Sequence, residues 1–368
     1  MQYPFVTALE TQIQETINQA AHYLRDGRLV IFPTETVYGL GALARSETAV
    51  NSLYRVKNRP MNHPVIVHLS EISQLSDWAV NIPPEALVLA EHFWPGPLTM
   101  VFQKHPSVGH WLTGGQNTIA IRIPSHPVTL RLLETVGDGI AAPSANPYGK
   151  LSPTQFSHIQ TLFDENVFSL HDIPLSLDGG SCSVGLESSI INMSRSFPEN
   201  RSLEDIARCI LRPGVITASM AQRVLQSADL EILDSDQTSL DTRVPGDRSN
   251  HYAPLTPLFL AKSGHVRQQY LSLKKDAGFS RVMVWTLSAM AADSDEWVQA
   301  PNDAREYGQQ LYHRLHQWDL SLRGDSKSAI LIEFPDTEHL DTAEAETWAA
   351  VQDRLLRAAI TPSADVIS

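Results

Sequence analysis

The chain has 368 residues, which is too long for one typical domain, so we expect two. Hydrophobic residues make up 42% of the chain, enough for an ordinary buried core in each domain. The net charge is −13, of which residues 1–227 carry −4 and residues 228–368 carry −9. An acidic chain is a poor general binder of nucleic acid, because neutralisation of phosphates supplies most of that affinity. Local basic pockets remain compatible with this composition.

The sequence also indicates a compartment. It has no apolar run of about 18 residues or more, so we expect no membrane-spanning helix and no association with a membrane. The first residues lack the basic start and apolar stretch of a signal peptide. The only cysteines are Cys182 and Cys209, too few for a disulfide framework. We therefore expect a cytoplasmic protein.

The N-terminal half alternates predicted helices with short apolar strands. Hydrophobic spacing predicts helices over 10–26, 47–57 and 84–93, and strands over 29–32, 65–69, 98–102 and 118–124. The first strand leads into a hydroxyl-rich turn at 33–41. One interpretation is that Thr34 and Thr36 cap the next helix; another is that Gly39 and Gly41 let the backbone approach something closely. With Ala44 these glycines match the spacing of a dinucleotide-binding fingerprint. The acidic residue that would bind the ribose about 20 positions further on is missing, which argues against a dinucleotide-binding fold.

Two cations, Lys57 and Arg59, stand between the second predicted helix and a β-branched strand. The residue before a proline is pushed out of the α region, so Arg59, which precedes Pro60, belongs in a loop at the end of that helix. Two cations beside a strand end would suit a polyanion. The alternative is that they are ordinary solvated charges at a helix C-terminus, where they complement the dipole.

Other predicted strands also end in cations or hydroxyls. In the strand over 118–124, Thr118, Ala120 and Arg122 share a face, so Arg122 points toward solvent or a cleft if the isoleucines face the core. Further hydroxyl-rich turns contain Ser144, Asn146, Ser152 and Ser188, and Arg212 ends another strand; turn residues of this kind often satisfy only their own backbone.

The C-terminal third differs in composition. Residues 228–250 have few large apolar side chains and many Asp and Ser, which is typical of a linker. Short strands over 258–260, 282–285 and 329–332 and helices over 303–317 and 345–359 then predict a small α/β domain with a parallel sheet. We place the boundaries at 1–227, 228–254 for the linker, and 255–368.

Several catalytic motifs are missing from the sequence. It has no G-x-x-x-x-G-K-S/T, no H-E-x-x-H and no G-x-S-x-G, which argues against a P-loop enzyme, a zinc hydrolase and a serine hydrolase. Fixed cations with hydroxyls between them suit phosphoryl or nucleotidyl transfer, where catalysis is mostly positioning and charge stabilisation. From the residues alone we predict a site for an anionic small molecule.

Eight stretches together resemble the threonylcarbamoyl-AMP synthase family, the YrdC-like enzymes of tRNA modification. They are FPTETVYGLG, KNRPMNHPVIVHL, WPGPLT, TIAIRIPSHP, IAAPSANPYGKLSPT, DGG, GLESSIIN and LRPG. The later PG…HYAP element at 245–254 resembles the longer, two-domain branch. The resemblance implies a twisted α/β open-barrel domain with a large cavity, followed by a smaller Rossmann-like domain.

The resemblance also implies a reaction. L-threonine, bicarbonate and ATP, with Mg²⁺ accompanying the ATP, would give threonylcarbamoyl-AMP and pyrophosphate. Downstream proteins would transfer the threonylcarbamoyl group to tRNA, so the chain would meet tRNA only indirectly. Lys57 and Arg59 would stabilise charge in the reaction. Nucleotide-contacting positions would be Lys57, Arg59, His63, Thr118, Ser144, Asn146, Ser152, Arg212 and His251. Threonine-side positions would be Thr34, Thr36, Tyr38, His68, Arg122, Ala142 and Ser188.

Two departures from the family pattern stand out. The family usually has Asn where this chain has His63, which can still donate one hydrogen bond. The linker has Asp247 to Asn250 where the family has an aromatic and a lysine before HYAP. Two alternative functions are a structured-RNA-binding module without chemistry, and a carbamoyltransferase that uses carbamoyl phosphate. The acidic charge disfavours the first, and the absence of cysteine clusters disfavours the second.

Overall fold

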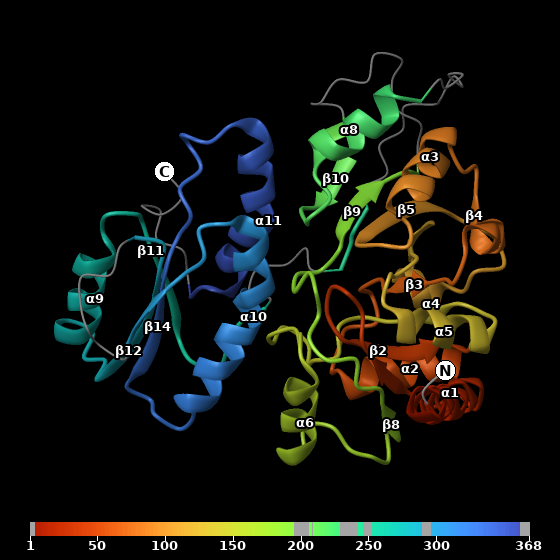
Figure 1. Ribbon diagram of the computed structural model, residues 1–368, viewed down its shortest axis with the longest axis horizontal. Coiled ribbons are helices and arrows are strands. Elements are labelled where there is room, and N and C mark those ends of the chain that lie inside the picture. The colour runs from red at the N-terminus through yellow and green to blue at the C-terminus, as the bar shows by residue number, and fades with distance from the viewer. Residues whose placement is uncertain are drawn as a thin grey trace.

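The computed structural model describes residues 4–194, 206, 207, 209–228, 242–245, 252–288 and 296–360, with side chains from residue 12 onward. Two bodies are visible, one built around a large mixed sheet and the other around a small parallel sheet (Figure 1). This arrangement confirms the predicted α/β class. Within the described residues, no helix combines the length and apolar composition that crossing a bilayer requires.

The large sheet has ten strands among the described residues. Their order is β10-β9-β5-β6-β3-β7-β2-β1-β8, with β4 paired to β5. The bounds are β1 Val30–Phe32, β2 Gly39–Leu43, β3 Ile66–His68, β4 Ala79–Val80, β5 Leu98–Lys104, β6 Thr118–Arg122, β7 Ile140–Ala141, β8 Leu175–Ser176, β9 Ser189–Asn192 and β10 Ile210–Arg212. The β3–β6 register is parallel and pairs His68 with Arg122, so two predicted site residues end neighbouring strands side by side.

Helices cover the two faces of this sheet unequally. The helices are α1 Pro4–Arg25, α2 Glu47–Val56, α3 Pro84–Phe93, α4 His110–Thr113, α5 Pro127–Val136, α6 Phe156–Asp164 and α8 Ala218–Gln226, with a 3₁₀ helix over Ile72–Asp77. The main core joins α2, α3 and α8 to the face that carries Ile119 and Ile121. A second core packs α1 and α5 against β1. On the opposite face, Ala120 joins only a small cluster that Val244 of the linker covers.

The C-terminal sheet is wholly parallel, in the order β11-β14-β12-β13. Its strands are β11 Leu258–Ala261, β12 Arg281–Thr286, β13 Trp297–Gln299 and β14 Ser328–Glu333. The helices are α9 Val266–Lys275, α10 Ala304–Ser321 and α11 Thr342–Ala358. Every residue of β14 is buried, as expected for a parallel strand covered on both sides. Figure 1 shows α10 and α11 on the side of this sheet that faces the first domain, and α9 on the far side.

The structure corrects the interpretation of the turn at 33–41. Gly39–Leu43 is strand β2, antiparallel to β1, and no helix follows Thr34 or Thr36 directly. A Cβ at Gly41 would lie 2.6 Å from the ring of Phe32 and 2.9 Å from Ile140. The backbone at Gly41 is closely approached, as the glycines suggested, but the neighbours are the core side chains of Phe32 and Ile140 and not a ligand. Thr34 instead closes its own turn, because its Oγ1 accepts the amides of Thr36 and Val37.

The sequence patterns missed α5, α6, α9 and the short strands β8 and β13. The boundary placed at 227 stays a prediction, because most of residues 229–251 lie outside the described part of the chain.

Candidate active site

A buried cavity opens on the lightly covered face of the large sheet. Its empty volume is about 580 Å³, including solvent at its mouth. Nine of the predicted site residues line it: Thr34, Thr36, Arg59, His68, Arg122, Ala142, Ser144, Ser188 and Arg212. They come from segments scattered over 179 positions of the chain, from 34 to 212.

Lys57 and Arg59 are not solvated surface charges, because they expose only 2% and 7% of their area. Lys57 is the C-cap of α2, and the left-handed backbone of Asn58 turns the chain toward Arg59. This confirms the loop predicted at the end of the helix. Arg59 lines the cavity, its Nη2 donates to the Pro64 carbonyl at 2.7 Å, and its guanidinium lies 5.6 Å from the ring centre of Tyr148.

The Lys57 side chain serves the turn that carries Ser144 and Asn146. Its Nζ donates to the Ser144 carbonyl at 2.6 Å and also to the Asn146 carbonyl. Burial, and then repulsion from Arg59, hold the pKa of this amine well below its usual value. Lys57 therefore lies behind the cavity wall and fixes the Ser144–Asn146 turn, and it is not one of the lining residues.

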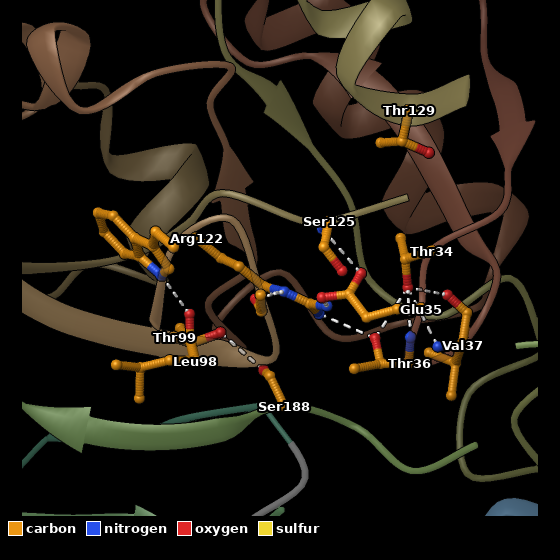
Figure 2. A network of polar contacts seen from close by, with 12 residues as sticks. Thr34, Glu35, Thr36, Val37, Leu98, Thr99, Arg122, Ser125, Thr129 and Ser188 are labelled. Atoms are coloured by element: carbon orange, nitrogen blue, oxygen red, sulfur yellow. Dashed lines mark hydrogen bonds and ion pairs between the residues drawn. The ribbon is translucent and has the colours of Figure 1, made fainter. Parts of the chain in front are cut away.

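Arg122 is the centre of a buried polar network (Figure 2). Its guanidinium donates from Nε to the Gly96 carbonyl at 3.1 Å and from Nη1 to Thr36 Oγ1 at 2.8 Å. Its Nη2 lies 2.7 Å from Glu35 Oε1, an ion pair in which both side chains are almost fully buried. Glu35 was not among the predicted site residues, although its place between two threonines of the conspicuous turn was a usable signal. Arg122 thus points into the cavity and not toward solvent.

A second polar group surrounds Arg212. Its Nε and Nη2 donate to the Ser188 carbonyl at 3.0 and 2.9 Å, and Nη2 also reaches Ser188 Oγ at 3.1 Å. Ser188 Oγ in turn lies 2.7 Å from Thr99 Oγ1, a contact visible in Figure 2. The remaining guanidinium nitrogen, Nη1, donates to the Pro245 carbonyl at 3.0 Å. Arg212 therefore connects the wall of the cavity to the linker.

Two described residues of the linker reach the cavity. Pro245 and Tyr252 both line it, and Tyr252 is buried with a φ of +64°. The next residue, Ala253, pairs with the first domain through its amide, which donates to the Gly149 carbonyl at 3.1 Å. His251 and the atypical residues 247–250 lie outside the described residues, so their predicted roles stay predictions.

Besides Lys57, five predicted residues are buried but do not line the cavity. Tyr38 holds the DGG turn, because its hydroxyl donates to the Gly180 carbonyl and accepts the Gly179 amide. Thr118 lies on β6, four residues before Arg122. His63 Nδ1 lies 3.4 Å from the Tyr148 hydroxyl.

The other two of these residues are Asn146 and Ser152. Asn146 donates its side-chain amide to the carbonyls of Pro147 and Lys150, and within the described part of the chain its Oδ1 accepts no hydrogen bond. Ser152 is fully buried, and its hydroxyl donates to Glu187 Oε1 at 2.6 Å. Both side chains are fixed in place by neighbours in the fold.

Glu187 is a cavity residue that the sequence patterns did not identify. Burial alone would raise the pKa of its carboxyl, but attraction to Arg354 and Arg212 and the hydrogen bond from Ser152 hold that pKa below its usual value. Arg354 belongs to α11 of the second domain, and its Nε lies 2.8 Å from Glu187 Oε2. The site therefore contains an ionised carboxylate whose main partner comes from the other domain.

Histidine charge plays little part at the cavity. Burial, followed by repulsion from Arg122, lowers the pKa of His68 to about 3, so its ring stays neutral at physiological pH. The cavity is therefore polar and cationic through its three arginines, and it contains hydroxyls but no charged histidine. Among the described residues, no cluster of three or more metal-ligating side chains occurs. This donor set suits an anionic ligand with hydroxyl and amide groups.

Two family models match the chain. The family model described as "Telomere recombination", which covers Sua5, YciO and YrdC proteins, matches residues 22–214. The model described as the C-terminal domain of threonylcarbamoyl-AMP synthase matches residues 202–360.

Individual relatives match over most of their length. Threonylcarbamoyl-AMP synthase from Bacillus subtilis is 35% identical over 350 residues, which cover 93% of this chain and 92% of that protein. The enzyme from Pyrococcus abyssi is 33% identical, over 82% of this chain and 85% of its own. The crystal structure of P. abyssi Sua5 complexed with L-threonine matches with a TM-score of 0.75 and 32% identity, covering 94% of both chains. This confirms the implied two-domain fold, and the chain belongs to the threonylcarbamoyl-AMP synthase family.

Proposed function

We propose that this protein converts L-threonine, bicarbonate and ATP into threonylcarbamoyl-AMP, pyrophosphate and water. The observation that carries the proposal is the convergence of Arg59, Arg122 and Arg212 with several hydroxyls on one buried cavity, in a chain of this family. Such a cavity offers the fixed positive charge and hydrogen-bond donors that nucleotidyl transfer requires.

Threonine would bind beside Arg122. That guanidinium is buried and already oriented by Thr36 and Glu35, so it presents a pre-positioned partner for a carboxylate. Thr34, Thr36, His68, Ala142 and Ser188 line the same cavity and would surround the rest of the amino acid, with Tyr38 holding the adjacent turn. The crystal structure of the P. abyssi relative complexed with L-threonine supports threonine as a ligand of this chain.

ATP would occupy the part of the cavity between Arg59 and Arg212. Ser144 lines this region. Asn146 offers a buried carbonyl oxygen without an internal partner in the described residues, and so an acceptor for the nucleotide. Lys57 would contribute positive charge from behind the turn. We retain His63, Thr118, Ser152 and His251 as nucleotide-side positions, and Tyr252, the neighbour of His251, lines the cavity.

The chemistry follows from these positions. The threonine amine takes up CO₂, formed from bicarbonate with loss of water, and becomes a carbamate. A carbamate oxygen then forms a bond to the α-phosphorus of ATP while the bond from that phosphorus to the pyrophosphate oxygen breaks. Arg59 and Lys57 would stabilise the charge on the phosphates. No side chain need act as a covalent nucleophile, because the carbamate oxygen itself attacks the α-phosphorus. Mg²⁺ would enter with ATP as part of the substrate, since this ion usually binds through substrate phosphates and few protein ligands.

The product is a mixed anhydride and therefore labile. We propose that downstream proteins receive it in the cytoplasm and transfer the threonylcarbamoyl group to tRNA. The chain has only two cysteines, which suits a reducing compartment.

Pyrophosphate release measured with and without threonine tests this function. We expect release to require both threonine and bicarbonate, and the product to have the mass of threonylcarbamoyl-AMP. Carbamoyl phosphate in place of bicarbonate and threonine is the control for a carbamoyltransferase. Turnover with carbamoyl phosphate alone, or no threonine dependence, would contradict the proposal.

A further inference from the structure

The second domain holds a carboxylate in the wall of the cavity, that of Glu187. Glu187 lines the cavity, yet two helices of the second domain hold one of its oxygens. Arg354 Nε of α11 lies 2.8 Å from Oε2, and the Tyr312 hydroxyl of α10 donates to the same atom at 3.1 Å. Arg354 and Tyr312 have no exposed area, so this contact is isolated from water.

The segment that carries Glu187 packs closely against the second domain. Gly185 has a φ of +74°, and a Cβ there would lie 2.6 Å from the backbone of Gln309 in α10. In the opposite direction, a Cβ at Gly308 would lie 2.8 Å from Leu186. Leu186 shares a buried cluster with residues of α10 and α11. The position of Glu187 is therefore set by α10 and α11 as well as by its own domain.

Glu187 is also the link to groups on the nucleotide side. Its other oxygen, Oε1, accepts the Ser152 hydroxyl at 2.6 Å. The Ser152 carbonyl lies 3.1 Å from His316 Nε2 of α10, so the second domain contacts this serine directly through His316 and indirectly through Glu187. Arg212, which lines the cavity, is close enough to Glu187 for electrostatic attraction.

The charge balance of the cavity shows why Arg354 matters. Without Arg354, the Glu187 carboxylate would repel the polyphosphate of ATP or draw Arg212 away from Ser188 and Pro245. A buried carboxylate that loses its partner is strongly unfavourable, whereas replacing both partners with neutral groups is often tolerated. The Arg354 guanidinium also lies 5.4 Å from the ring centre of Tyr252, which lines the same cavity.

We propose that Arg354 is a positioning residue of the cavity, supplied by the C-terminal domain, which neutralises Glu187 and thereby keeps Ser152 and Arg212 in place for the nucleotide. The inference rests on the proposed function, because it uses the nucleotide placement given there. It assigns the second domain a defined part in binding ATP and none in binding threonine.

The test uses the full chain and initial rates of threonine-dependent pyrophosphate release, varying ATP and threonine separately. We expect Arg354→Met to raise KM for ATP at least about tenfold and to leave KM for threonine within about twofold. Glu187→Gln combined with Arg354→Met should bring KM for ATP back to within about threefold of wild type, because the uncompensated charge is gone. Lys274→Met is the matched control: Lys274 lies on α9, on the far side of the second domain, where it pairs with Glu296, and its loss should change neither KM.

An unchanged KM for ATP in a folded Arg354→Met variant would overturn the inference. So would a double variant that is no better than the single one. If Arg354→Met does not fold, Glu187→Gln is compared with the double variant instead. Once Glu187 is neutral, Arg354 should matter little for ATP, so KM values for ATP that differ by more than about threefold between these two variants would overturn the inference. If wild-type protein turns over normally and one of these comparisons fails, the inference alone is defeated. Wild-type protein without threonine-dependent release defeats the proposed function and this inference with it.

Discussion

The role of Lys57 can be decided by replacing it with methionine. The substitution keeps the length and apolar stem of the side chain but removes the amine that donates to the carbonyls of Ser144 and Asn146. A hydrogen bond from a charged donor contributes about 1.5–3 kcal/mol, and an acceptor left buried without a partner costs a similar amount. Removal of a buried amine relieves part of this cost, because burial already disfavours its charged form. We therefore expect the free energy of unfolding to fall by about 2–3 kcal/mol.

Activity should fall with stability, because the released turn contains Ser144 and Asn146. We expect KM for ATP to rise at least about tenfold, whereas kcat at saturating ATP should fall less. Urea unfolding gives the stability change, and pyrophosphate release gives the kinetic constants. Lys150→Met is the matched control, since Lys150 lies close to this turn but is exposed, and we expect it to change neither quantity.

The two possible roles of Lys57 give different results. If the amine acts directly on the phosphates, Lys57→Met should lose kcat while its stability stays at the wild-type value. That outcome would refute the assignment of Lys57 to the turn. Equal stability of the Lys57 and Lys150 variants would refute it as well.

Three further predictions concern other parts of the molecule. Arg122→Lys should raise KM for threonine at least about tenfold with little change for ATP, because lysine cannot keep all the contacts that the planar guanidinium makes; a KM for threonine like that of wild type would contradict this. Burial lowers the pKa of His158 to about 2 and that of His316 to about 4, so below the ordinary value of about 6.5 the unfolded chain binds more protons. The free energy of unfolding should thus fall by about 1 kcal/mol per histidine between pH 7.5 and 5.5, and urea titrations at both pH values should show a smaller fall in a His158→Gln, His316→Gln variant. Gly41→Ala should cost about 1–3 kcal/mol in urea unfolding while KM for ATP is unchanged, because the new methyl group would meet the buried ring of Phe32; full stability would show that the ring can move.

Local signals predicted much of the fold. The helix over 84–93 begins at Pro84 and ends at Phe93, as its hydrophobic spacing indicated. The alternation over 118–124 correctly placed Ile119 and Ile121 in the main core and Arg122 on the other face. These predictions succeeded because period and capping are properties of a few consecutive residues.

Partners distant in sequence could not be predicted in the same way. The Glu35–Arg122 ion pair joins the turn after β1 to the end of β6, and Glu187 meets Arg354 across the domain boundary. The sequence patterns show that each of these groups is charged but not which opposite charge it faces, since that depends on the sheet order and on the docking of α11. The same limit explains why Lys57 was expected at the phosphates, whereas its amine reaches two carbonyls of a turn almost 90 positions away.

The partners of the three cavity arginines explain why the site uses arginine. Each is already oriented by the protein: Arg59 by the Pro64 carbonyl, Arg122 by Glu35, and Arg212 by the Ser188 carbonyl. A guanidinium has five N–H donors in a fixed plane, so it can keep its internal partners and still offer donors to a ligand. An ammonium has three donors, and the one lysine of the KxR motif already commits its amine to two carbonyls and lies outside the cavity lining. Positive charge held in this way needs little reorganisation when an anion binds, which is the condition for strong electrostatic stabilisation of a transferring phosphoryl group.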